Sequence, residues 1–76
     1  MTDKQVNLRQ GLQRLGFTTG VQMRLYGEVF DFVGEPIFLT DYLVVIKAQE
    51  KKTGEIRRVG IPLPVVYMAS GSHVAA

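Results

Sequence analysis

Hydrophobic and polar residues recur along the chain with two spacings, first helical and then alternating. Near the N-terminus, Leu8, Leu12 and Leu15 are four and three residues apart, so they fall on one face of a helix. Gly11 lies inside this segment and weakens a helix by roughly 1 kcal/mol relative to alanine. The pattern predicts one short amphipathic helix, which needs a surface to lie on.

After Phe17 the spacing changes to the alternation that is typical of half-buried strands. Gly27 interrupts this alternation and predicts a bulge or a sharp bend. The tripeptide at 34–36 predicts a turn, and the charged, glycine-containing stretch 50–55 predicts a hairpin loop. The expected strands are 21–26, 28–33, a long run over 37–49 that bends near Thr40 and Asp41, 56–61, and a last short strand at 65–68.

The long run contains four consecutive aliphatic residues, from Leu43 to Ile46. Neighbouring side chains of a strand point to opposite faces, so this stretch predicts a strand that is buried on both sides. Five short strands close most easily into a barrel, because closure removes exposed sheet edges. We therefore expect a mostly β fold, in which an N-terminal helix precedes a small, strongly bent, five-stranded antiparallel barrel.

The composition indicates one small domain. The chain has 76 residues, 46% of them hydrophobic, and a core of this size is close to the lower limit for independent folding. We expect a single domain over residues 1–68 and a flexible C-terminal tail over 69–76. Oligomerisation is a common remedy for an undersized core, so we expect a second copy of the chain to cover part of the apolar surface.

The sequence also predicts where the protein resides. It has no run approaching the roughly 20 apolar residues of a membrane span. The first ten residues are too polar for a signal peptide, and the chain has no cysteine. We expect a cytoplasmic protein with no membrane association.

Charge is distributed unevenly along the chain, although the net charge is only +2. Residues 28–41 carry four acidic and no basic residues, whereas residues 1–16 and 47–58 are mainly basic. This distribution is compatible with an ordinary solvated surface. It is also compatible with a basic patch that binds nucleic acid.

Residues that support catalysis are scarce. The only serines, Ser70 and Ser72, and the only histidine, His73, lie close to the C-terminus. Asp31 and Asp41 could form an acidic pair, but nothing in the sequence brings them together. We therefore expect no enzymatic activity, no cofactor, no metal site and no small-molecule substrate.

Two segments resemble the motifs of a known family. The stretch TDYLVVIK at 40–47 resembles the first Sm motif, in which an acidic and an aromatic residue precede an aliphatic strand. The stretch GEIRRVGIPLPVV at 54–66 resembles the second Sm motif. Over residues 4–68 the chain resembles the Sm-like fold of the Sm, LSm and Hfq proteins, in particular the divergent Sm-like proteins of marine phage or metagenomic origin.

The resemblance implies a function and a set of site residues. Sm-like proteins form rings in which the fourth strand of one subunit pairs with the fifth of its neighbour, and we expect a ring of five to seven subunits. The expected ligand is single-stranded RNA or DNA. Tyr42 would stack on a base and Arg58 would hold it, with Arg57, Lys47 and Asp41 as further candidates.

An alternative function belongs to a different class. An SH3-like barrel of this size could instead bind a protein partner, or have a structural role, without contacting nucleic acid. The acidic segment 28–41 and the aromatic residues Phe30 and Phe32 favour this interpretation, because they could line a peptide groove.

Overall fold

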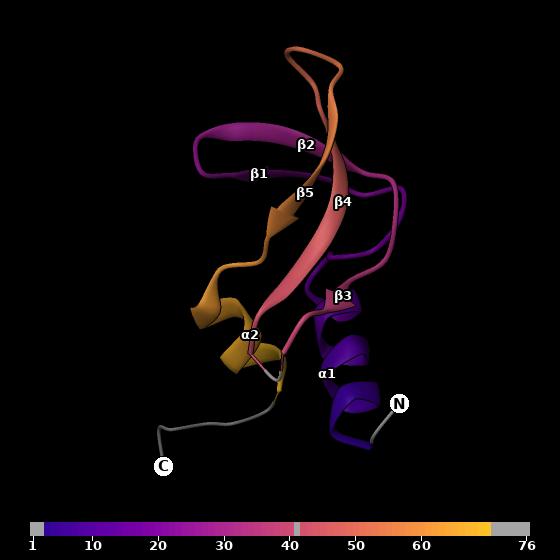
Figure 1. Cartoon of the computed structure of the whole chain (residues 1–76), viewed down its shortest axis with the longest axis vertical. Helices are drawn as coiled ribbons and strands as arrows, with labels where there is room; N and C mark the ends of the chain where they lie inside the picture. The colour runs from indigo at the N-terminus through magenta and orange to yellow at the C-terminus, as the bar shows by residue number, and fades with distance from the viewer. Residues whose placement is uncertain (1–2, 41, 71–76) are drawn as a thin grey trace.

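The computed structural model describes residues 3–40 and 42–70, which form two helices and five strands. The expected helix at the N-terminus is confirmed, and the strands that follow it are all antiparallel (Figure 1). In chain order the elements are α1 (Asp3–Arg14), β1 (Gln22–Leu25), β2 (Glu28–Phe32), β3 (Ile37–Phe38), β4 (Val44–Glu50), β5 (Ile56–Gly60) and α2 (Leu63–Ala69).

Strand β4 is the centre of the sheet. Strand β5 pairs along one of its edges, whereas β2 and β3 share the other edge, and β1 pairs with the outer side of β2. The sheet does not close, because within the described residues β1 and β5 each pair with a single neighbour. The expectation of an N-terminal helix and five antiparallel strands is thus confirmed, although two of the strands differ from those predicted, and a closed barrel is not seen.

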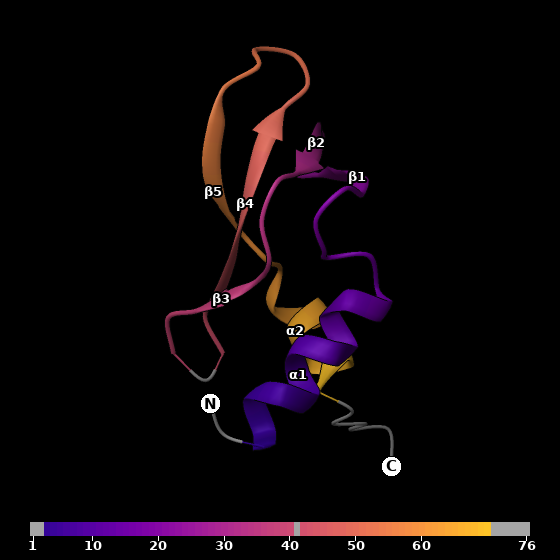
Figure 2. The same cartoon turned by 90° about the vertical axis from the view of Figure 1, so that its right-hand side faces the viewer.

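The sheet bends sharply where β2 ends. Phe32 pairs with Ala48 and Ile37 pairs with Val45, so four residues of one strand oppose only two of β4. Such an excess of residues bends a strand and increases its twist. The bend lies at the predicted turn over 34–36 and sends the β1–β2 hairpin across the β4–β5 hairpin (Figures 1 and 2).

The hairpin turn between β1 and β2 is formed by two residues. Leu25 pairs with Glu28, and Tyr26 and Gly27 between them have φ angles of 53° and 78°. Positive φ at both central positions is the geometry that matches the twist of a hairpin. Of the two alternatives predicted for Gly27, the sharp bend is correct and the bulge is wrong.

The core lies between α1 and the concave side of the sheet. Leu12 of α1 and Phe30 and Phe32 of β2 are among its most deeply buried side chains. Within β4, burial alternates, with Val44, Ile46 and Ala48 buried and the residues between them partly or fully exposed. The prediction that the strand is buried on both faces is therefore wrong: it has one buried face and one open face.

The long β run expected over 37–49 is divided. Strands β3 and β4 are separate and antiparallel, and the amide of Leu39 donates a hydrogen bond to the carbonyl of Leu43 at 2.8 Å. Leu43, predicted to be buried, therefore lies in the loop and is 52% exposed. One reason is that Thr40 holds the loop through hydrogen bonds from its neighbours' amides to its side-chain hydroxyl.

The last predicted strand, at 65–68, is helical. Residues 63–69 form α2, with a proline in the first turn, where its missing N–H needs no partner. Val66 and Ala69 are buried against the rest of the protein, so packing overrides the β preference of the valines. Neither α1 nor α2 is long and apolar enough to cross a membrane, and no other helix is present in the described residues.

Gly11 allows the two helices to come together. A Cβ atom at this position would lie 2.0 Å from the backbone oxygen of Ala69, so the interface has no room for a side chain. The glycine that weakens α1 as an isolated helix is therefore required by the contact between α1 and α2.

Candidate functional site

Lys47 and Arg58 lie directly opposite each other on the open face of the β4–β5 pair. Both side chains are exposed, and among the described residues neither has an ion-pair partner. Like charges that face each other across an antiparallel pair destabilise it. Two of the candidate residues thus form a positively charged pair with no acidic partner in the described part of the chain.

The same face carries apolar and neutral neighbours. Val45 and Gln49 lie on either side of Lys47, and their partners on β5 are Gly60 and Ile56. Ile56 is 52% exposed. We call this surface, formed by residues 45, 47, 49, 56, 58 and 60, the open sheet face.

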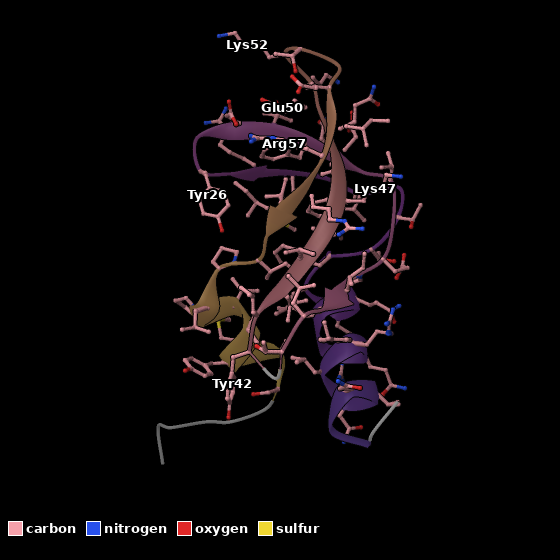
Figure 3. All side chains as sticks on the ribbon, viewed as in Figure 1. Tyr26, Tyr42, Lys47, Glu50, Lys52 and Arg57 are labelled. Carbon is pink, nitrogen blue, oxygen red and sulfur yellow. The ribbon has the colours of Figure 1, made fainter. Side chains whose placement is uncertain are left out.

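Arg57 points to the opposite side of the sheet. Its guanidinium lies 3.1 Å from a carboxylate oxygen of Glu28 and 3.4 Å from one of Glu50, and it covers the ring of Phe30 at 5.6 Å. These contacts tie β5 to the β1–β2 hairpin and compensate the charge (Figure 3). The structure therefore shows which of the two adjacent arginines is ion-paired, namely Arg57, and which faces outwards without an acidic partner among the described residues, namely Arg58.

Tyr42 lies at the other end of β4, away from Lys47. The two residues are five positions apart, which an extended chain spans in at most about 18 Å. The ring of Tyr42 contacts that of Tyr67 edge-on, with centroids 5.6 Å apart, and 49% of the residue is exposed. This pairing of two tyrosines that are distant in sequence could not be predicted, because the position of α2 follows from tertiary packing.

Exposed apolar residues surround the two tyrosines. The surface that we call the apolar end consists of Leu39, Tyr42, Leu43, Leu63 and Tyr67, all more than 40% exposed. Large contiguous apolar surfaces are typical of interaction sites. This part of the molecule is better suited to a protein contact than to phosphate binding.

Two sequence predictions about aromatic and acidic residues have different outcomes. Phe30 and Phe32 are expected from the sequence to line a peptide groove. They are only 0% and 1% exposed, so that prediction is wrong. They face the core because they alternate with the outward-facing residues of β2. Asp41 lies outside the described residues.

A cavity of about 470 Å³ separates the turn of the β1–β2 hairpin from the β4–β5 hairpin. We call it the hairpin notch; it is lined by Gly27, Glu28, Val29, Glu50, Lys51 and Lys52. Figure 3 shows Lys52 at the tip of one hairpin, above Glu50 and Arg57. The residues of this site are not adjacent in the sequence, and no local pattern predicts it, because only the bend brings Glu28 close to the predicted loop 50–55.

No protein-family model, no curated protein and no solved structure matches the chain. The physical properties of the open sheet face, the apolar end and the hairpin notch are therefore the basis for a functional proposal.

Glu35 has a structural part in this arrangement. Its carboxylate accepts hydrogen bonds from the backbone N–H of Thr19, from the amide of Gln13 and from the hydroxyls of Thr18 and Thr19. These donors, the Thr19 N–H foremost, lower the pKa of Glu35 from 4.5 to about 2. The carboxylate thus fastens the bend between β2 and β3 to the connection that follows α1.

Proposed function

We propose that the protein binds single-stranded nucleic acid through the open sheet face, as a homo-oligomer with an Sm-like domain. The observation that carries the proposal is the like-charged pair Lys47 and Arg58, opposite each other without an acidic partner in the described part of the chain. The pair is unfavourable in the isolated protein. A phosphate backbone would relieve the repulsion, because each cation could neutralise a phosphate and release a counterion.

The resemblance to Sm-like proteins favours RNA over DNA. Three features support an Sm-like domain: the leading helix, the strand bent at 33–36, and the hairpin that lies across β4 and β5. One side chain links the β1–β2 turn to the end of β5, which are not paired in the sheet: the hydroxyl of Tyr26 donates a hydrogen bond to the carbonyl of Gly60 at 2.6 Å. The segment corresponding to that family's closing strand is α2, so the proposed similarity covers residues 3–61.

Self-association is the second part of the proposal. The apolar end exposes five aliphatic and aromatic side chains, and side chains of this kind form the buried parts of many protein interfaces. A second copy is the partner that a small protein with much exposed apolar surface always has available. Tyr42 would then lie near a subunit boundary, where its exposed ring could stack on a base of the bound strand.

The test is fluorescence anisotropy with labelled U-rich and A-rich RNA at 50 and 200 mM salt. Arg58→Gln should weaken binding and reduce the slope of log affinity against log salt by about 0.7, the value for one phosphate contact to a single strand. Tyr42→Ala should weaken binding by about 1–3 kcal/mol with the slope unchanged. Arg14→Gln, an exposed residue on α1, is the charge-matched control and should leave affinity nearly unchanged.

Two outcomes would overturn the proposal: absence of binding at 50 mM salt, or binding that the combined Tyr42→Ala and Arg58→Gln variant leaves intact. The apolar end then favours the second candidate, a protein-interaction or structural module with no role in nucleic-acid binding. Absorbance of the purified protein separates the two, because co-purifying nucleic acid raises the ratio at 260 and 280 nm.

A further inference from the structure

The hairpin notch lies apart from the open sheet face and contains a carboxylate that the fold holds in place. We propose that it binds a guanine base, with Glu50 as the hydrogen-bond acceptor, an inference that rests on the proposed binding of single-stranded nucleic acid. The notch has a volume of about 470 Å³, within the range of ligand pockets.

Glu50 is positioned by its backbone. Its amide donates to the carbonyl of Glu55 at 2.8 Å, and its carbonyl accepts from the amide of Gly54 at 2.7 Å. Both bonds close the β4–β5 hairpin, so the Cα atom of Glu50 is fixed at the edge of the notch. The side chain is 11% exposed, which is low for a carboxylate next to a loop.

Within the described part of the chain, only one of the two carboxylate oxygens of Glu50 contacts a cationic group. The Nε of Arg57 lies 3.4 Å from its Oε2, whereas the described residues provide no hydrogen-bond donor for its Oε1. Arg57 also contacts Glu28, so one guanidinium serves two carboxylates. An ionised carboxylate only accepts hydrogen bonds, and a group with N–H donors is therefore the natural ligand.

Among the bases, guanine fits this acceptor best. Its Watson–Crick edge presents two adjacent donors, N1–H and the N2 amino group, which match Oε1, free of donors among the described residues, and the remaining acceptor capacity of Oε2, where Arg57 lies at 3.4 Å. Uracil presents one N–H between two carbonyl oxygens that a carboxylate repels, and adenine presents an acceptor beside its amino group. Single-stranded nucleic acids are read in this way, through edges of unstacked bases.

Lys51 and Lys52 complete the site. They line the notch together with Glu28 and Glu50, and both are exposed on the loop that joins β4 to β5. They can therefore neutralise the phosphates on either side of a bound guanosine. Since Lys47 and Arg58 lie on the same hairpin, one strand could contact the open sheet face and place a base in the notch.

The test compares three eight-nucleotide RNAs in the anisotropy assay: all-uridine, the same RNA with one central guanosine, and the same RNA with inosine there. Inosine keeps N1–H and lacks the N2 amino group. Wild-type protein should bind the guanosine RNA at least about fivefold more tightly than the uridine RNA, with inosine between them. Glu50→Gln should reduce the preference to less than twofold, whereas Glu55→Gln, with the same charge change on the same hairpin, should retain it.

Each failure is distinguishable. Equal affinity of the wild-type protein for all three RNAs, with the effect of Arg58→Gln intact, overturns the guanine site and leaves the proposed function standing. Absence of binding to any RNA at low salt overturns both. The inosine comparison uses unmodified protein, so it decides the question even if Glu50→Gln fails to fold.

Discussion

At the residue scale, the adjacent side chains of Arg57 and Arg58 lie on opposite faces of the sheet and differ in their contacts. Arg57 faces the core side and joins Glu28 and Glu50, whereas Arg58 faces outwards beside Lys47. Strand alternation implies that these two arginines diverge, but it does not say which one is outermost. The answer comes from Val59, which is buried. Arg57 shares its face of the strand with Val59 and therefore points to the core side, whereas Arg58 points outwards.

Gly11 provides the first prediction at this scale. Gly11→Ala would stabilise an isolated helix by about 1 kcal/mol, but here the new methyl group would collide with the backbone oxygen of Ala69. We expect a net loss of about 1–3 kcal/mol in the free energy of unfolding, measured by urea denaturation. Gly60→Ala is the control, because no atom lies within 4 Å of a Cβ there; an equal loss in both variants would contradict this explanation.

Glu35 provides a prediction about pH. Its pKa is about 2 in the folded protein and 4.5 when unperturbed, so its hydrogen bonds stabilise the fold fully above pH 4.5. That contribution is lost progressively as the pH falls from 4.5 to 2. Glu35→Gln should therefore lower stability at pH 6 and make it less dependent on pH below 4.5, in urea titrations at several pH values.

The control for Glu35 is Glu55→Gln, whose side chain makes no hydrogen bond or ion pair within the described part of the chain. If both variants have the same stability at pH 6 and the same dependence on pH, the carboxylate of Glu35 does not fasten the bend.

At the scale of elements, local pattern predicted α1, the strand alternation and the hairpin loop over 50–55. It failed where tertiary packing decides. Val65 and Val66 favour a strand, yet they belong to α2 because Ala69 packs against Gly11. The open sheet face could be partly predicted from Lys47 and Arg58, whereas the hairpin notch could not, because it combines two hairpins that are distant in sequence.

The link between the two hairpins is testable with a matched pair of variants. Arg57→Gln removes the charge that compensates Glu28 and the largely buried Glu50, and should lower the free energy of unfolding by about 1–2 kcal/mol. Arg58→Gln removes the same charge from the exposed face and relieves the repulsion with Lys47, so it should leave stability unchanged or raise it by less than about 0.5 kcal/mol. Urea denaturation distinguishes them; equal losses would show that Arg57 does not tie the hairpins together.

At the scale of the whole molecule, an open sheet and an apolar end leave much hydrophobic surface exposed. Such a surface is unfavourable for an isolated small protein. We therefore predict self-association, and the proposed Sm-like domain implies that light scattering gives a mass of five to seven times the 8.5 kDa of the chain. Leu63→Asp, which places a charge in the apolar end, should shift the mass towards the monomer, whereas Lys52→Asp should not.

A wild-type mass of 8.5 kDa at micromolar concentration would remove the oligomer from the proposal. Binding through the open sheet face would then have to be a property of the single chain, because Lys47 and Arg58 belong to the same hairpin.

The most direct test of the central claim is to map which residues of the protein an RNA contacts. Amide chemical shifts of the labelled protein, followed during titration with eight-nucleotide U-rich RNA at 50 mM salt, report this residue by residue. The largest changes should cluster at 45–49 and 56–60, in the two strands that carry the open sheet face. Unchanged shifts at saturating RNA, or changes confined to α1 and α2, would contradict the claim.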